Sequence, residues 1–450
     1  MMLASWLYPG FLTVVASGLL RVASCEVTVS HLRTTVLGTD PEGSARLNGL
    51  SFQQGPLTSF NGWQYIAYYE STGTYNANHV ALGRRNLNGG DEPSEWEIFR
   101  FTDYVQQTQD EHNTISMGIS PDGFIHLSYD HHDVPLNYRV SNEAIALDPE
   151  AHTWDASLFG ETLHSLPGAG DGPWTPVTYP RFERAGEDFL FEMRIGASGS
   201  GDSYIYRYAS GSWSQVGRYI QGDDNNAYIN GLTHANGTLY VTWTWRETPD
   251  VVTNHDLGYA SSIDLGSTWE NNAGEALGST ITPDSPGIHV IEIPQNSGIL
   301  NQEGQTVDNS GRVHVVNREI LDGTLTWLHY WRDEEGTWSR NPIRHELGPL
   351  TQTGHRGKLA AHPATGDILA ILAANEGVDV AVYVATRDSG YSDWTEAWRG
   401  GAYDVEPLFD RALWDGEGGV EAGSVLSLFL NTQGSYPDRE VTVVDLEVRV

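Results

Sequence analysis

Along most of this chain, short apolar runs alternate with turns that contain glycine. In seven places a Gly turn leads into a strand-like run of alternating pattern, and no strongly periodic helical segment competes with it. The copies begin at Asn61 (NGWQYIAYY), Asp122 (DGFIHLSYD), Gly186 (GEDFLFEMR), Asn236 (NGTLYVTWTWR), Ser310 (SGRVHVVNR), Thr365 (TGDILAILA) and Gly423 (GSVLSLFLN). The pattern therefore predicts an all-β chain built from one repeated unit.

A tryptophan follows each of the first six copies, after a further turn. These residues are 56 to 69 positions apart: Trp96, Trp154, Trp213, Trp269, Trp338 and Trp394. The segment SIDLGSTW, Ser262 to Trp269, matches the Asp-box hairpin S-x-D-x-G-x-T-W, which is structural and carries no catalytic information. Repeats of this length with about four strands each predict a seven-bladed β-propeller. We expect the segment from Glu26 to close the last blade beside the C-terminal strand, which removes exposed sheet edges.

The first residues have the character of a targeting segment. Residues 3–24 are apolar and end in small residues, which predicts a secretory signal peptide over 1–24, cut near Ser24 or Cys25, and an extracellular protein. The tetrapeptide VASC also fits a bacterial lipoprotein site, a minor alternative. The mature chain, 25–450, is expected to be one propeller domain, and its lone Cys25 allows no internal disulfide.

The formal net charge of −34 limits the partners that this chain can bind. Nucleic-acid binding needs a basic surface, which this composition does not supply, and the sequence offers no convincing membrane span. An anionic substrate would need a local basic pocket inside an acidic protein. We expect a monomer.

The second copy, with its flanks, contains four histidines. Antiparallel pairing around the Asp122–Gly123 turn places position 112 opposite about position 133, so His112 and His132 are expected side by side. His126 occupies the same slot as His314 in another copy, which favours a framework role. His131 and His132 are adjacent on a strand and point to opposite faces, so joint metal ligation by that pair is disfavoured.

The same counting places polar residues from other copies at the same mouth of the ring. Strand-end tyrosines and arginines usually pack or face solvent, but several that converge form a concave site. The set is Tyr179 and Arg194, Tyr228 and Arg246, Asn301, Gln302 and Arg318, and His355 and Arg356.

These residue types suit proton abstraction beside a carboxylate. No glycosidase acid pair, G-x-S-x-G nucleophile or phosphate loop is visible. In a uronic acid, an arginine or protonated histidine that neutralises the carboxylate makes the C5 proton removable, and a histidine or tyrosine takes it. An acid then protonates the C4 oxygen as that bond breaks, which is β-elimination.

The segments EHNTISMGISPDGFIHLSYDHH, TYPRF, FEMRIGASGSGDS and LNQEGQTVDNSGRVHVV resemble the BNR-repeat polysaccharide lyases over nearly all of the mature chain. That family includes ulvan lyases and the fungal L-rhamnose-α-1,4-D-glucuronate lyase, and the secretion signal favours the latter. The resemblance implies catalytic His112, His132 and Tyr179 and the carboxylate-binding Arg194. Further substrate contacts are expected at Asn113, Tyr228, Arg246, Gln302, His355 and Arg356.

The resemblance leaves several choices open. Which of His112, His132 and Tyr179 is acid and which is base differs among relatives. No cofactor is expected for catalysis, although some relatives carry a structural metal ion, here a possible Ca²⁺ without assigned ligands. The expected substrate is an acidic polysaccharide or oligosaccharide. The alternatives are an α-L-rhamnosidase on the same linkage, a sialidase on the strength of the Asp box, and a non-catalytic carbohydrate-binding propeller.

Overall fold

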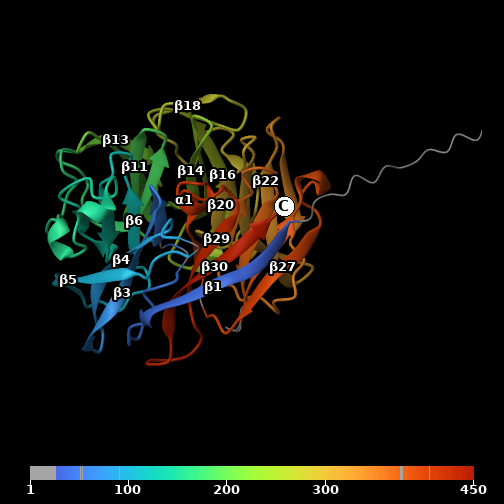
Figure 1. Cartoon of the computed structure of the whole chain (residues 1–450). Coiled ribbons are helices and arrows are strands. Elements are labelled where there is room, and N and C mark those ends of the chain that lie inside the picture. Colours follow the sequence, from blue (N-terminus) through green and yellow to red (C-terminus); the bar gives the residue numbers. More distant parts are fainter. Residues whose placement is uncertain (1–26, 51, 53, 91, 375–378, 405) are drawn as a thin grey trace, which may run out of the picture.

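The computed structural model describes residues 27–450 apart from 51, 53, 91, 375–378 and 405 (Figure 1). The expected signal peptide and its cleavage site lie outside these residues. Within them the structure is nearly all β-sheet, with one α-helix of four residues, α1 (Arg411–Trp414). Short 3₁₀ helices are η1 (Pro149–Ala151), η2 (Ala156–Leu158), η3 (Val251–Thr253) and η4 (Arg387–Ser389). None of the helices in this part of the chain has the length and apolar character that crossing a membrane would require.

Three of the sheets in the described residues are four-stranded antiparallel meanders, in which strands follow one another in sequence order. The first has β2 (Leu57–Phe60), β3 (Trp63–Thr74), β4 (Ala77–Asn86) and β5 (Glu97–Gln106). Another has β20 (Gly304–Val307), β21 (Val313–Leu321), β22 (Thr324–Arg332) and β23 (Trp338–Pro342). The third has β24 (Lys358–Ala361), β25 (Ile368–Ala373), β26 (Asp379–Ala385) and β27 (Trp394–Gly401). These meanders have the four strands per repeat that the sequence predicts.

The middle of the chain forms one large sheet and one small sheet. The small sheet has β6 (Ile115–Ile119), β7 (Ile125–Tyr129) and β9 (Tyr138–Val140). The large sheet has 11 strands: β8 (His132–Val134), β10 (Val177–Ala185), β11 (Asp188–Ala197), β12 (Ser200–Ala209), β13 (Ser212–Ile220), β14 (Asn226–Ala235), β15 (Thr238–Arg246), β16 (Asn254–Ser262), β17 (Trp269–Glu270), β18 (Ala276–Gly278) and β19 (His289–Ile291). One parallel pair, Gly201 with Asn226, joins β12 to β14.

The two ends of the described chain lie together in the last sheet. Its strands run in the order β1 (Thr28–Thr39), β30 (Glu440–Arg449), β29 (Val425–Asn431) and β28 (Leu408–Phe409). Figure 1 shows blue β1 along red β30, and the register pairs Thr28 with Arg449 and Thr39 with Glu440. The expected closure of the last sheet by the N-terminal strand is confirmed.

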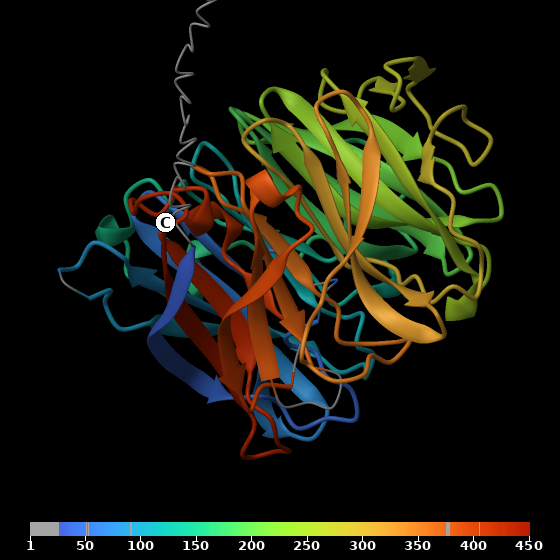
Figure 2. The same cartoon turned by 90° about the vertical axis from the view of Figure 1, so that its right-hand side faces the viewer.

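The hydrophobic core lies between the sheets, which Figure 2 shows fanned side by side. On β3, Tyr65, Ala67 and Tyr69 pack toward β6 and β7, whereas Ile66 and Tyr68 pack against the last sheet. Successive side chains point to opposite faces of a strand, so a strand buried on both faces needs a continuous apolar run. The Ile66 cluster includes Val441 and Val443, so the last sheet packs against the first.

The structure corrects the expected second hairpin. Its strands were predicted to continue to His112 and His132, but the ladder between β6 and β7 ends at Ile115 with Tyr129. Asp130 adopts a left-handed backbone (φ 62°), and β8, which begins at His132, pairs with β10 of the large sheet. If the pairing of Ile115 with Tyr129 is continued residue by residue, position 112 falls opposite position 132 rather than the expected 133.

Other expected strand positions also shift. Asn301 and Gln302 precede β20, and His355 and Arg356 precede β24, although each pair was expected to begin an inner strand. The blade count of seven stays a prediction, because the described strands form six sheets rather than seven.

Candidate active site

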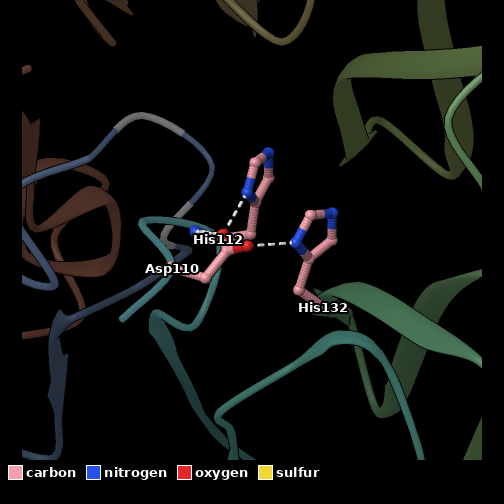
Figure 3. Close-up of side chains that lie close together, drawn as sticks. All are labelled: Asp110, His112 and His132. Atoms are coloured by element: carbon pink, nitrogen blue, oxygen red, sulfur yellow. Dashed lines mark hydrogen bonds and ion pairs between the residues drawn. The ribbon is translucent and has the colours of Figure 1, made fainter. Parts of the chain in front are cut away.

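His112 and His132 lie face to face, although they come from different elements. Their ring centroids are 4.0 Å apart with an interplanar angle of 23° (Figure 3). His112 lies in the turn before β6, and His132 begins β8. Each side chain is about 30% exposed, at 31% and 30%. The pair is thus open to a ligand on one side and held by protein on the other.

Asp110 holds both imidazoles at once. Its Oδ1 lies 2.5 Å from Nδ1 of His112, and its Oδ2 lies 2.5 Å from Nδ1 of His132. The backbone N–H of His112 also donates to Oδ1, at 2.9 Å. Burial opposes ionisation of Asp110, but the hydrogen bonds from the two histidines outweigh it and hold the pKa of Asp110 below its ordinary value. An ionised carboxylate only accepts, so both Nδ1 atoms carry hydrogen.

Phe52 packs on the other face of His112. Their rings are stacked with centroids 5.1 Å apart and an angle of 9°. The Tyr179 ring lies 5.8 Å from Phe52 and 5.7 Å from His112. Leu50, Phe52, Tyr179 and Tyr228 form one buried hydrophobic cluster. The aromatic rings of Phe52 and Tyr179 therefore support His112, which in turn stacks on His132.

Arg194, on β11, connects Tyr179 to the histidine pair. Its guanidinium carbon lies 4.8 Å from the Tyr179 ring centroid, and its Nη2 donates to Asp133 Oδ1 at 2.6 Å and to Thr178 at 2.9 Å. The other carboxylate oxygen of Asp133 lies 4.0 Å from Nε2 of His132. Nε and Nη1 of Arg194 are buried and have no hydrogen-bond partner among the described residues. Two donors thus remain for an anionic ligand.

Tyr179 is also surrounded by positive charge from two other parts of the chain. Arg246 lies 5.5 Å from the Tyr228 ring, and Arg356 lies 5.5 Å from the Phe52 ring. Burial raises the pKa of Tyr179, as does nearby Tyr228, while Arg194, Arg356 and Arg246 act to lower it. Three arginines therefore act on one tyrosine in a chain of net charge −34, and two of them are also paired with carboxylates, Arg194 with Asp133 and Arg356 with Glu406.

The two tyrosines differ in what their hydroxyls contact. The Tyr228 hydroxyl lies 2.6 Å from that of Ser198, and the two rings are 5.8 Å apart. Among the described residues, the Tyr179 hydroxyl has no hydrogen-bond partner. Tyr179 also has a left-handed backbone (φ 59°), which costs energy for a residue other than glycine and is often found at functional sites.

Three further predicted site residues, Asn113, Gln302 and His355, contact groups other than the histidine pair. Asn113 is buried, and its Nδ2 donates to Thr108 beside Asp130. Gln302 is buried and accepts from Asn301. His355 lies 4.0 Å from Asp404, and burial lowers its pKa although Glu406 and Asp404 oppose that shift.

The arginines beyond Arg194 are each held by protein groups. Arg318 is fully buried against Glu303 at 2.6 Å. Arg356 pairs with Glu406 at 2.8 Å and donates to the Asn301 carbonyl. Arg246 donates to the carbonyls of Thr248 and Pro249.

The other two histidines of the second copy, His126 and His131, are buried, as expected for the framework role predicted for His126. His126 lies 2.6 Å from the Tyr138 hydroxyl, and burial lowers its pKa to about 3. His131 accepts from the backbone N–H of Asn137, and its pKa is likewise lowered to about 3 by burial and by His164. His314, in the slot shared with His126, is buried and stacks on His329. None of the three reaches the His112–His132 pair.

Asp110, His112 and His132 are also the described residues whose ligand atoms lie close enough together to hold a metal ion, within 4.8 Å. Two imidazoles and one carboxylate suit zinc better than Ca²⁺, which prefers oxygen ligands. The stacked rings direct both Nδ1 atoms to separate oxygens of Asp110, so the arrangement is satisfied by hydrogen bonds. It offers no support for a calcium site here.

A cavity of about 380 Å³ lies along the inner strands. Neither His112 nor His132 lines this cavity. Its lining residues come instead two positions after the site residues Phe52, Tyr179, Tyr228 and Arg356. They are Gln54, Arg181, Asn230 and Lys358. The cavity is thus separate from the histidine pair.

Asp110 and Phe52 were not singled out from the sequence, and Asp133 was noted only as a carboxylate near the predicted site. Asp110 was visible as a carboxylate two positions before His112, and Asp133 directly follows His132. Phe52 belongs to a segment before the first repeat and carries no repeat signal.

A family model described as a BNR repeat-containing family member matches residues 63–346, more than half of the chain. This protein belongs to the BNR repeat-containing family. All four strongest site residues, His112, His132, Tyr179 and Arg194, lie inside the matched region. No curated protein matches this BNR-repeat chain significantly.

Solved structures resemble this BNR-repeat protein over almost its full length. A polysaccharide lyase, Uly1, is 17% identical with a TM-score of 0.68, over 93% of this chain and 99% of that one. An ulvan lyase bound to -[GlcA(1-4)Rha3S]- is 15% identical with a TM-score of 0.65, over 93% and 98%. At such identities the likeness shows a shared fold.

Proposed function

We propose that this protein is a secreted polysaccharide lyase that breaks the bond at C4 of a uronic acid by β-elimination, with rhamnose-α-1,4-glucuronate as the linkage. The observation that carries the proposal is the convergence of His112, His132 and Tyr179 with Arg194, Arg246 and Arg356. Proton-transfer groups beside clustered cations suit an anionic sugar. The rest of the acidic surface would repel such a substrate, so binding concentrates at this site.

The open proton-transfer roles are assigned by what each group already contacts. Nε2 of His112 has no partner among the described residues, so His112 is the base that removes the C5 proton. Tyr179 is the acid, because burial keeps its hydroxyl protonated and the nearby arginines stabilise the phenolate formed after donation. His132, with Asp110 and Asp133 near its two nitrogens, is assigned to the substrate carboxylate together with Arg194.

The bond changes follow from these positions. His112 takes the C5 proton while Arg194 and His132 neutralise the substrate carboxylate, which lets charge spread into an enolate-like intermediate. The electron pair then forms the C4–C5 double bond as the C4–oxygen bond breaks. Tyr179 gives its proton to the leaving oxygen. The product is an unsaturated uronate, and no water is consumed.

The choice of glycan rests on the relatives. The ulvan lyase of similar fold was solved with a chain of glucuronate linked 1-4 to sulfated rhamnose. The sequence resemblance to rhamnose–glucuronate lyases supports the unsulfated linkage of gum arabic. Arg246 and Arg356 would contact neighbouring sugars, and Asn113, Gln302 and His355 would support the site's outer part. No cofactor and no metal are needed for these steps.

The proposal includes the finer organisation of the protein. Seven buried clusters each pack one repeat against the next and then the last against the first, which supports seven blades once the large sheet is divided at its parallel pair. We also propose a secreted monomer, cut near Ser24 or Cys25. N-terminal sequencing of the secreted protein tests the cleavage, and sedimentation tests the monomer.

The activity is tested with a panel of uronate polysaccharides: gum arabic, ulvan, glucuronan and pectin. Ultraviolet absorbance of the unsaturated product should rise with gum arabic or ulvan and stay flat with pectin. Release of rhamnose without absorbance would favour the α-L-rhamnosidase instead. Binding without any product would favour the carbohydrate-binding reading.

A further inference from the structure

The carboxylate of Asp110 is shared by the two stacked imidazoles. Each oxygen accepts one Nδ1–H: Oδ1 accepts from His112 and Oδ2 accepts from His132 (Figure 3). Asp110 is itself fixed, because Oδ1 also accepts the backbone N–H of His112 two residues on. The carboxylate therefore sets the ring orientation and the tautomer of both histidines together.

We propose that Asp110 is the positioning residue of this site. It holds both histidines with hydrogen on Nδ1, so that Nε2 of His112 is the proton-transfer atom and Nε2 of His132 is the atom that meets the substrate carboxylate. The expected effect on kcat rests on the proposed function, whereas the expected tautomers of the two histidines do not. Asp110 does not touch the reacting atoms. In Figure 3 both Nε2 atoms point away from Asp110.

The shared carboxylate also couples the charge states of the pair. Two imidazolium rings at 4.0 Å repel each other, whereas one imidazolium beside one carboxylate is stabilised.

Other charged groups facing the pair break its symmetry. Asp133 lies 4.0 Å from Nε2 of His132, although Arg194 neutralises much of its charge. His112 instead packs between Phe52 and His132, with Tyr179 at 5.7 Å and Arg356 across the Phe52 ring. The two histidines therefore differ in the groups that face them, although Asp110 holds both.

The matched pair of variants is Asp110→Asn and Glu111→Gln. A carboxamide offers one acceptor oxygen and one NH₂ donor, so in D110N one histidine must turn its Nδ1 into an acceptor and move its hydrogen to Nε2. Glu111 is the exposed neighbour, with no contact to either ring, and E111Q removes the same charge. A purely electrostatic or structural effect would appear in both variants or in stability alone.

The first measurement is nitrogen NMR of histidine-labelled, substrate-free protein, with His112 and His132 assigned from their alanine variants. Wild type and E111Q should show both histidines with hydrogen on Nδ1, and D110N should show one of them switched to Nε2. Unchanged tautomers in D110N, or wild-type rings without hydrogen on Nδ1, would overturn the proposal. The wild-type spectrum decides this even if D110N does not fold, and it needs no enzyme activity.

The second measurement is kinetic and uses the substrate that wild type cleaves. D110N should lose kcat by about 10²- to 10⁴-fold with KM little changed, as expected when a catalytic imidazole is held in the wrong tautomer. E111Q should keep the wild-type kcat and KM. Equal kinetics in D110N and E111Q would overturn the role. If wild type shows no lyase activity but the tautomers are as expected, the proposed function fails and the positioning role stands.

Discussion

His112 and His132, twenty residues apart in sequence, stack their rings at 4.0 Å while donating to opposite oxygens of one aspartate.

The first prediction follows from this pair. His112→Ala should abolish uronate release, a loss of at least about 10²-fold, because it removes the base. The thermal midpoint should change little, since the ring is partly exposed. His289→Ala, at an exposed position on β19, should keep full activity; activity in H112A would remove His112 from the mechanism.

Removing only the Tyr179 hydroxyl isolates its role as acid. Tyr179→Phe keeps the ring contacts with Phe52 and Arg194 and should lower kcat by about 10²- to 10⁴-fold with a small change in KM. Tyr228→Phe should cost less, since that hydroxyl is already bonded to Ser198. Tyr75→Phe, at a 56% exposed position, is the neutral control. A larger loss of kcat in Y228F than in Y179F would mean that Tyr228, rather than Tyr179, is the acid.

Arg194 is predicted to bind the substrate carboxylate through its two unpartnered donors. Arg194→Ala should reduce kcat/KM by about 10²- to 10³-fold, and Arg194→Lys should recover little, because an ammonium cannot reproduce a planar pair of donors. Arg207→Ala breaks an exposed ion pair with Asp188 and serves as the control. Steady-state kinetics on the cleaved polysaccharide checks this, and full recovery in R194K would mean that charge alone matters.

The buried His126 predicts acid sensitivity of the fold. Burial lowers its pKa from 6.5 to about 3, so the folded state keeps it neutral while the unfolded chain takes up a proton below pH 6.5. Its contribution is present above pH 6.5 and is lost as pH falls from 6.5 toward 3. Between pH 7 and pH 5 this amounts to about 2 kcal/mol of unfolding free energy. Urea unfolding should show a shallower loss in His126→Gln than in wild type or His289→Gln; parallel curves for all three would refute it.

The repeat pattern alone predicts the all-β architecture and the closing strand, because strand periodicity and Gly turns are local signals. It also predicts the approach of His112 to His132, since a hairpin register carries both residues to one end. The same counting missed that β8 leaves its own sheet for β10, because the left-handed Asp130 breaks the strand.

The parts of the site that counting could not reach depend on side-chain direction and on distant segments. Asn113 directly follows His112, yet turns toward Asp130 because a buried amide finds its partners there. Phe52 comes from outside the repeat and Asp110 from a loop, where register does not apply. Arg318 fits the strand-end pattern but forms a buried ion pair with Glu303, since a buried guanidinium needs a charged partner.

The central claim is elimination rather than hydrolysis. Digestion of gum arabic or ulvan in ¹⁸O-labelled water, followed by mass spectrometry, tests it most directly. Elimination breaks the C4–oxygen bond without water, so the new uronate end should be unsaturated and free of ¹⁸O. No unsaturated end should form with H112A. A saturated uronate end, with ¹⁸O on one of the two new ends, would mean that the site hydrolyses its substrate and would contradict the account.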